Sequence, residues 1–258
     1  MRYEEDLIQF EDNIQETARK LIQKLKDKLK EANADGYVIG MSGGLDCSTV
    51  TMLCSKANVK AFVVSMPNGA SMTPTTREHC TKLCQKAGYT LHTIDIGNEC
   101  KSIINTANSQ RVQDHQAGAG YNGYDIITTN VPPRVRMTYL YAFAGAKNYL
   151  VLGTSNLSEL TAGYFTKWGD GASDFEPLKD LTKSEVRILA KYLGVPEEII
   201  NKAPSADLWQ GQTDEDEMGM TYKEMDKAIR HPEEANPEIL AKVEEMKRKS
   251  RHKMVLFA

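Results

Sequence analysis

The hydrophobic pattern begins with a long amphipathic helix. Between residues 4 and 33, apolar residues recur at steps of three, four or seven, with Glu, Lys and Arg between them. The recurring positions are Leu7, Ile14, Ala18, Leu21, Leu25 and Leu29. We expect this face to pack on a sheet or on a second subunit. Asp35 and Gly36 end the helical pattern.

Short apolar runs then alternate with helical patterns. The predicted strands are 37–41, 60–66, 90–95 and 149–154. The predicted helices between them are 45–57, 75–87 and 134–146. This alternation predicts an α/β fold, a doubly wound, Rossmann-like parallel sheet flanked by helices. Because such sheets bind ligands at the carboxyl ends of their strands, we expect the loops after these strands to form one rim.

The second half of the chain is richer in loops. Residues 117–124 contain three glycines and predict a mobile loop, either a lid or a plain connection. The glycine- and aromatic-rich stretch 163–177 is long enough to suggest a functional loop. A capping box of Thr182 and Glu185 opens a predicted helix that Gly194 ends.

The C-terminal third combines short helices with charged segments. Residues 196–200 predict a short helix, and the acidic stretch 204–219 predicts a mobile or solvated loop. Terminal helices are expected at 220–230 and 238–249, the second ending in a basic cluster at 247–253. That cluster either complements the helix dipole on a solvated face or binds an anion.

Composition narrows the class of protein. The 258 residues are 41% hydrophobic and 26% charged, as in a soluble globular protein, and we expect one domain. A net charge of -3 gives no basis for non-specific nucleic-acid binding, and no apolar run is long enough to cross a membrane. The acidic N-terminus lacks a signal-peptide core, so we expect a cytoplasmic protein. Five cysteines without Cys-x-x-Cys pairs argue against a disulfide framework.

The most informative stretch lies where the first predicted strand meets its helix. An apolar strand breaks into Ser42-Gly43-Gly44 and runs into a helix opened by Asp46. Glycines allow close backbone approach to an anion, and the helix N-terminus favours negative charge. The carboxylate beside this cradle suits a divalent metal carried on phosphates. An ordinary tight strand-to-helix turn is the alternative, and a Walker A motif is excluded because no Gly-Lys-Ser/Thr follows.

This loop resembles the Ser-Gly-Gly-x-Asp-Ser loop of the ATP pyrophosphatases, which split ATP into AMP and pyrophosphate. Further blocks then match in order the ammonia-dependent NAD synthetases, at 130–137, 153–159, 163–171, 202–208 and 252–253. The block Phe165-Thr166-Lys167-Trp168-Gly169-Asp170-Gly171 is the most specific of them. The resemblance covers about residues 40–253 and implies an adenine nucleotide alpha-hydrolase-like fold over 1–258, without a glutaminase domain.

The resemblance also implies a reaction. Nicotinate adenine dinucleotide (deamido-NAD), ATP and ammonia would give NAD, AMP and pyrophosphate through a carboxyl adenylate. Since the substrate carboxylate is the first nucleophile, no Ser-His or Cys-His pair is needed, and catalysis rests on positioning and charge stabilisation. Mg²⁺ is the implied cofactor and a homodimer the implied assembly.

Site residues follow from the resemblance position by position. The implied ATP-binding residues are Gly40, Met41, Ser42, Gly43, Gly44, Leu45, Asp46, Cys47, Thr154, Lys183 and Ser205. The implied deamido-NAD-binding residues are Arg134, Lys167, Asp174, His252 and Lys253. Asp46 and Glu159 are the implied Mg²⁺ ligands, and the implied catalytic residues are Asp46, Asp174 and Lys183. We expect Asp174 to hold or deprotonate ammonia.

Three positions depart from the family pattern. Cys47 stands where serine is usual, so the group expected to contact pyrophosphate is a thiol here, or the hydroxyl is supplied by Ser48. Ser205 stands where threonine is usual, and Asn68 where an aromatic residue commonly precedes glycine. A tRNA-thiolating or tRNA-lysidine-type ligase is the alternative enzyme class, although the acidic total and the lack of a basic domain count against it. An adenine-nucleotide sensor on the same fold is the non-enzyme alternative.

Overall fold

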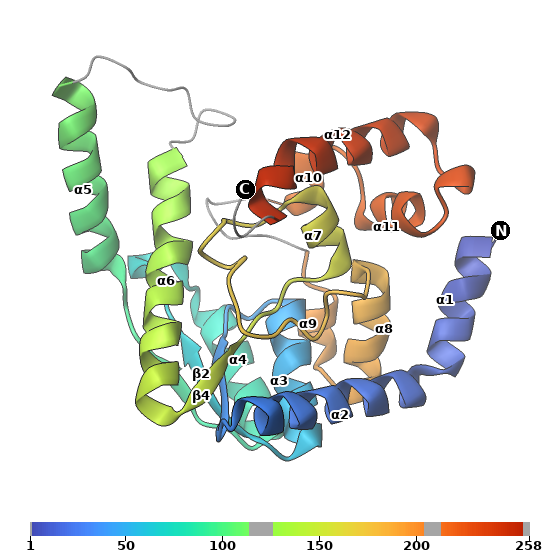
Figure 1. Ribbon diagram of the computed structural model, residues 1–258, viewed down its shortest axis with the longest axis horizontal. Helices are drawn as coiled ribbons and strands as arrows, with labels where there is room; N and C mark the ends of the chain where they lie inside the picture. Colours follow the sequence, from blue (N-terminus) through green and yellow to red (C-terminus); the bar gives the residue numbers. More distant parts are fainter. Residues whose placement is uncertain (1, 114–125, 204–212, 255–258) are drawn as a thin grey trace.

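The computed structural model describes residues 2–113, 126–203 and 213–254 (Figure 1). The first half contains α1 (Arg2–Asp12), α2 (Ile14–Ala32), β1 (Gly36–Gly40), α3 (Leu45–Ala57), β2 (Lys60–Ser65), η1 (Gly69–Ser71), α4 (Pro74–Ala87), β3 (Leu91–Thr93) and α5 (Gly97–Gln113). The second half contains α6 (Ile126–Lys147), β4 (Tyr149–Leu152), α7 (Leu157–Ala162), α8 (Lys183–Leu193), α9 (Glu197–Ile200), α10 (Asp214–Met218), α11 (Tyr222–Arg230), η3 (Pro232–Glu234) and α12 (Pro237–Met254).

The four described strands form one parallel sheet in the order β3-β2-β1-β4. Val38 of β1 is in register with Phe62 of β2 on one side and with Val151 of β4 on the other. The chain moves outward from β1 through β2 to β3 and then returns to β4 on the opposite side of β1. The strand order therefore reverses beside the carboxyl end of β1, where doubly wound sheets bind ligands. The predicted parallel sheet and its rim are confirmed.

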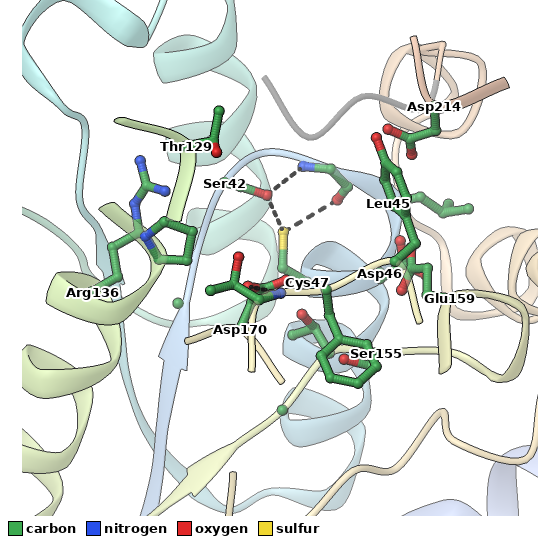
Figure 2. A pocket seen from close by; sticks show the side chains of 18 of the residues that line it. Ser42, Leu45, Asp46, Cys47, Thr129, Arg136, Ser155, Glu159, Asp170 and Asp214 are labelled. Atoms are coloured by element: carbon green, nitrogen blue, oxygen red, sulfur yellow. Dashed lines mark hydrogen bonds between the residues drawn. The ribbon is translucent and has the colours of Figure 1, made fainter. Parts of the chain in front are cut away.

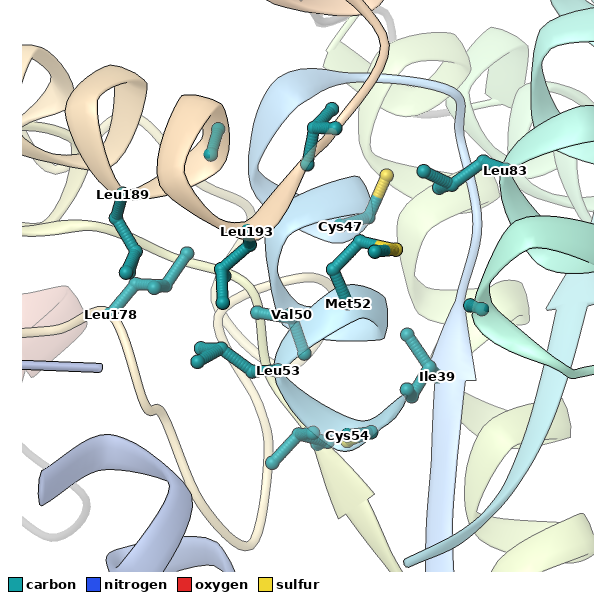
Figure 3. Close-up of a cluster of buried hydrophobic side chains, with 14 of the residues drawn as sticks. Ile39, Cys47, Val50, Met52, Leu53, Cys54, Leu83, Leu178, Leu189 and Leu193 are labelled. Carbon is teal, nitrogen blue, oxygen red and sulfur yellow. The ribbon is translucent and has the colours of Figure 1, made fainter. Parts of the chain in front are cut away.

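Two apolar cores cover the two faces of this sheet. Neighbouring residues of β1 belong to different cores, Ile39 to one and Val38 to the other, because side chains alternate across a strand. The Ile39 core packs α2, α3, α4 and α8 against the sheet, with Leu53 of α3 fully buried at its centre (Figure 3). The Val38 core is formed with α5 and α6. A third core joins α7, α11 and α12 and includes Met225, which is fully buried.

Several element boundaries differ from the predictions. The long N-terminal helix is two helices that meet at Asn13, and α1 turns away so that its buried Tyr3 donates a hydrogen bond to Ser184 of α8. Helix α5 was not predicted, because its apolar residues follow no clear 3.6-residue period. Helix α6 begins before residue 134 and runs through Pro132 and Pro133, which would ordinarily mark a helix start.

The prediction of a solvated loop over 204–219 was wrong in its last part. Residues 214–218 form α10, which Thr213 caps by accepting the N–H of Asp216, and Asp214 is only 5% exposed. Four consecutive acidic residues suit the N-terminus of a helix, where the dipole favours negative charge. Helix α12 extends through the basic cluster to Met254. The glycine-rich stretch 117–124 and residues 204–212 lie outside the described residues.

Candidate active site

The glycine turn after β1 is held in a shape that only glycine adopts without strain. Gly43 has a φ of +84°, and a Cβ added there would lie 2.8 Å from the Cγ2 of Thr76 and 2.9 Å from the Sγ of Cys80. Glycine therefore both makes the turn and lets α4 pack against it. The turn delivers the N-terminus of α3 to the sheet rim, and the first N–H groups of a helix have no intrahelical acceptors. This is the geometry of an anion site.

A large cavity opens at this rim. Its volume is about 1180 Å³, above the usual range for a single small ligand, so it can hold two substrates. The lining draws on the loops after β1, β2 and β4 and on α6, α10 and α12. Figure 2 shows part of it, with Ser42 after β1, Arg136 on α6 and Asp214 on α10. The predicted residues that line it are Gly40, Met41, Ser42, Gly44, Leu45, Asp46, Cys47, Thr154, Glu159, Lys183 and Lys253. Sequence positions more than 200 residues apart thus meet in one site.

Three charged residues from three helices converge in the cavity wall. Lys183 at the start of α8 donates to Asp46 Oδ2 over 2.6 Å and to Glu159 Oε1 over 3.0 Å. Asn156, which caps α7, donates its side-chain N–H to the other carboxylate oxygen of Asp46 over 2.9 Å. The predicted metal ligands and the predicted phosphate-binding lysine are therefore direct neighbours. We call Asp46, Glu159 and Lys183 the charged cluster.

Burial perturbs the ionisation of this cluster. Desolvation opposes the charge on Lys183, but the carboxylates of Asp46 and Glu159 outweigh it and raise the pKa of Lys183, so the amine stays protonated. Burial raises the pKa of Glu159, Lys183 offsets part of that rise, and the neighbouring charge of Asp46 adds to it. Two carboxylates beside one cation leave the cluster with an excess of negative charge, which suits a second cation.

Cys47 occupies the position that the family usually gives to serine. Its Sγ lies 3.4 Å from Ser42 Oγ and donates to the carbonyl oxygen of Gly44 over 3.3 Å (Figure 2). Met41 Sδ lies 3.7 Å away. The thiol therefore stabilises the glycine turn from within as well as lining the cavity. All five cysteines are buried thiols without disulfides.

The predicted dinucleotide residues link the 163–171 loop to α12. Lys167 Nζ donates to the carbonyl oxygen of His252 over 2.6 Å, and Arg134 Nε donates to that of Lys167 over 3.2 Å. Lys253 Nζ donates to the carbonyl oxygens of Gly163 and Phe165, each over 2.8 Å. Within the described residues only Lys253 of this group lines the cavity.

Asp174 is placed differently from the expectation. Its carboxylate accepts the N–H of Val151 over 2.7 Å and the hydroxyl of Tyr141 over 3.3 Å, and it is absent from the described cavity lining. Asp170 of the same loop does line the cavity. Its carboxyl accepts the N–H of Thr166, and partial desolvation raises its pKa, although the open cavity leaves the residue accessible to solvent. Ser205 lies outside the described residues.

Sequence reasoning missed four groups at or behind the cavity wall. Asp214 lines the cavity and accepts a hydrogen bond from Tyr222, whose ring lies 5.0 Å from Lys183 Nζ. Arg136 lines it too and donates to the carbonyl oxygen of Met66. Glu176 lies behind the wall and accepts the N–H of Ser155 over 2.9 Å. Only Arg136 lay in a block that signalled a site, and no local pattern marks the others.

No helix in the described ranges is both long and apolar enough to span a membrane. The same part of the chain contains no cluster of three or more His, Cys, Asp or Glu side chains arranged to bind a metal. A metal at the charged cluster would therefore take its remaining ligands from substrate and water, which is the usual arrangement for Mg²⁺ on a nucleotide.

Comparison with known proteins identifies a family that uses ATP. The family model described as NAD synthase matches residues 17–256. The NH(3)-dependent NAD(+) synthetase of Carboxydothermus hydrogenoformans is 39% identical over 93% of this chain and 95% of its own. That of Methanococcus aeolicus is 45% identical over 84% of this chain and 82% of its own.

Two solved structures are similar to this chain over nearly its whole length. The NMN synthetase of Francisella tularensis superposes with a TM-score of 0.86 at 36% identity, covering 95% of this chain and 97% of that one. The NH3-dependent NAD synthetase of Campylobacter jejuni superposes with a TM-score of 0.74 at 29% identity, covering 95% and 98%. With the family model matched over nearly the whole chain, the protein belongs to the NAD synthase family.

Proposed function

We propose that the cavity carries out the family's reaction. The enzyme amidates deamido-NAD with ammonia at the expense of ATP, which is the last step of NAD biosynthesis. The nicotinate carboxylate attacks the α-phosphorus of ATP, pyrophosphate leaves, and ammonia then displaces AMP from the carboxyl adenylate. The observation that carries the proposal is the charged cluster directly beside a phosphate-binding turn.

The ATP half of the site follows from the charges. The glycine turn and the N-terminus of α3 accept the phosphates, and Lys183 meets the charge that develops on the leaving pyrophosphate. Asp46 and Glu159 are hard oxygen donors less than one fifth exposed, and they fit Mg²⁺. When bound, Mg²⁺ would neutralise charge on the phosphates. The residues themselves position ATP and exclude part of the solvent.

Ammonia needs a carboxylate near the adenylate, because ammonium predominates at neutral pH and must lose a proton before it attacks. Asp170 is better placed for this role than the predicted Asp174, since Asp170 lines the cavity. Its carboxylate accepts the N–H of Thr166 and is accessible to solvent, so ammonium can reach it. Asp174 would instead contribute to dinucleotide binding with Arg134 and Lys167.

A second substrate has a specific observation in its favour. The structure from Francisella tularensis, a relative similar over nearly the full chain, is described as an NMN synthetase. This chain would then amidate nicotinate mononucleotide. The charged cluster serves either substrate, because both present the same carboxylate. Comparing kcat/KM for the mononucleotide and the dinucleotide under identical conditions decides between them.

We also infer that residues 1–258 form one ligase domain, that the protein is a homodimer and that it is cytoplasmic. Exposed apolar side chains on α5 and α6, Ile103 and Tyr141, support an interface on these helices (Figure 1). Light scattering coupled to size-exclusion chromatography tests the dimer by mass.

The proposed function is tested with purified protein, ATP, Mg²⁺, deamido-NAD and ammonium. We expect AMP, pyrophosphate and NAD in equal amounts. Replacing ammonium by glutamine should abolish NAD formation. Failure to form AMP with any nicotinate substrate would overturn the proposal, and tRNA binding that survives moderate salt would favour the alternative ligase class.

A further inference from the structure

Asp226 is a buried carboxylate that the reaction described above does not use. It lies on α11, has no exposed surface, and does not belong to the described cavity lining. Its Oδ1 accepts the hydroxyl of Ser158 over 2.5 Å. Its Oδ2 accepts both the N–H and the hydroxyl of Ser184, over 2.8 and 2.6 Å. One carboxylate thus receives three hydrogen bonds from two other helices, α7 and α8.

These bonds fix the first turn of α8, the helix that begins with Lys183. The N–H of Lys183 donates to Ser158 Oγ over 3.0 Å, and the N–H of Ser184 donates to Asp226. The N–H of the third helical residue, Glu185, donates to Thr182 Oγ1. Three orphan donors of the helix are therefore satisfied by side chains from three different places. A negative charge at this end also complements the helix dipole.

The same bonds set the distance between two members of the charged cluster. Ser158 directly precedes Glu159 on α7, and Ser184 directly follows Lys183 on α8. Asp226 holds both serines with one rigid carboxylate, so α7 and α8 cannot slide past each other without breaking its bonds. The 3.0 Å contact between Lys183 Nζ and Glu159 Oε1 lies one residue away from each anchor.

A carboxylate is a costly choice for a purely structural contact at this position. Isolating its charge from water is unfavourable, and apolar residues of similar size usually pack a buried interface as well or better. The neighbouring residue Met225 is fully buried in an apolar core with Met218, Met220 and Val243. A carboxylate can accept hydrogen bonds from three donors at fixed angles, and an apolar side chain cannot.

We propose that Asp226 is a positioning residue for adenylate formation, which sets Lys183 against Glu159 by holding Ser158 and Ser184. The inference rests on the proposed function, because it assigns Lys183 to the phosphates of ATP. Asp226 itself touches no substrate. Its replacement should therefore weaken interactions made in the transition state more than the binding of substrates.

Asp226→Asn is the first variant, because an amide keeps the size but cannot accept all three bonds. We expect kcat to fall about 10- to 100-fold, since misplacing a catalytic group by about 1 Å costs about 100-fold. The KM for ammonium should stay within about twofold. Ser158→Ala breaks the same link at its other end and should lower kcat in the same way. The double variant should be no worse than the poorer single variant by more than about threefold.

Glu224→Gln is the matched control. It makes the same carboxylate-to-amide change two residues away on α11, where the Glu224 carboxylate accepts the N–H and the hydroxyl of Thr221 at the helix start. We expect its kcat to equal that of the unaltered enzyme. Three outcomes would overturn the inference. Asp226→Asn could keep the kcat of the unaltered enzyme, the losses of the two single variants could multiply in the double variant, or Glu224→Gln could lose as much kcat as Asp226→Asn. If Asp226→Asn does not fold, the kcat of Ser158→Ala tests the inference alone. A lowered kcat supports it, and an unchanged kcat overturns it. Absence of activity in the unaltered enzyme would instead refute the proposed function.

Discussion

Removing the cation from the charged cluster should destabilise the protein more than removing one of its anions. Lys183 is 5% exposed at its side chain, and Asp46 and Glu159 are 14% and 17% exposed. Lys183→Met leaves two carboxylates facing each other with no counter-charge. Asp46→Asn leaves Lys183 paired one-to-one with Glu159. Both variants should lose turnover, so activity alone cannot separate their roles, whereas stability can.

The expected magnitudes follow from the contacts. Removing one partner of a buried ion pair lowers the free energy of unfolding by about 3–5 kcal/mol, because the remaining charge is buried without compensation. Asp46→Asn loses one charge-assisted hydrogen bond, worth about 1.5–3 kcal/mol. It also removes the negative charge that adds to the rise burial causes in the pKa of Glu159. Its net cost should be about 1 kcal/mol. At about 2–4 °C per kcal/mol, Lys183→Met should lower the Tm by about 10 °C and Asp46→Asn by only a few degrees.

Thermal unfolding at two pH values with and without MgCl₂ tests this reasoning. In Lys183→Met the pKa of Glu159, which burial already raises, should rise further because the offsetting cation is gone, so stability is greater at pH 6 and is lost as the pH rises to 8. Mg²⁺ should restore part of the Tm of Lys183→Met by binding its two carboxylates. It should do little for Asp46→Asn, which retains Lys183 and only one of the two ligands. A Tm lowered more by Asp46→Asn than by Lys183→Met, or no response of Lys183→Met to Mg²⁺, would refute it.

Three further substitutions probe separate parts of the site. Cys47→Ser should keep kcat within about threefold, because a hydroxyl can also donate to the carbonyl of Gly44; a tenfold loss in steady-state assays would show that the thiol has a role of its own. Burial raises the pKa of Glu176 to about 8 from 4.5, so the folded protein keeps a proton there and loses stability as the pH rises between these values. Denaturant titrations should show Glu176→Gln without that loss, gaining about 3 kcal/mol relative to the unaltered protein between pH 5.5 and 8.5, and parallel profiles would contradict the assignment. Asp170→Asn should raise the KM for ammonium about tenfold or more and leave AMP formation less affected, whereas an unchanged KM would return the role to Asp174.

The parts of the molecule that the sequence predicted are those with a local signature. The run of apolar residues predicts β1, the glycines predict the turn at Gly43, and the capping box predicts the start of α8. Each of these signals comes from residues adjacent in the chain. The parallel sheet then follows, since strands that alternate with helices have few other arrangements. The rim position of Asp46 and Thr154 follows in turn from the sheet.

The parts that were missed depend on tertiary contacts. The break at Asn13 accompanies the contact of Tyr3 with Ser184 of α8, and nothing near Asn13 in the sequence indicates that contact. Asp214 was assigned to a solvated loop because four acidic residues in a row ordinarily face water, yet Tyr222 holds it in the cavity wall. Asp226 has no local signal at all, since its partners are 42 and 68 residues away in the chain.

The choice between Asp170 and Asp174 shows the limit of positional resemblance. Both lie in one glycine-rich loop, four residues apart, and charge alone does not distinguish them. The structure directs Asp174 to the N–H of Val151 at the edge of β4 and Asp170 to the cavity. Which of them meets ammonia depends on how the loop folds, and the contacts that place the two carboxylates, with Val151 and Thr166, are visible only in three dimensions.

The central claim is that the substrate carboxylate attacks ATP at its α-phosphorus, and an isotope measurement tests it most directly. Deamido-NAD labelled with ¹⁸O in its nicotinate carboxylate is incubated with unlabelled ATP, Mg²⁺ and ammonium, and the products are analysed by mass spectrometry. The carboxyl adenylate transfers one carboxylate oxygen to phosphorus, so the account predicts AMP that carries one ¹⁸O and unlabelled pyrophosphate. AMP free of ¹⁸O, or ADP and phosphate as products, would contradict it.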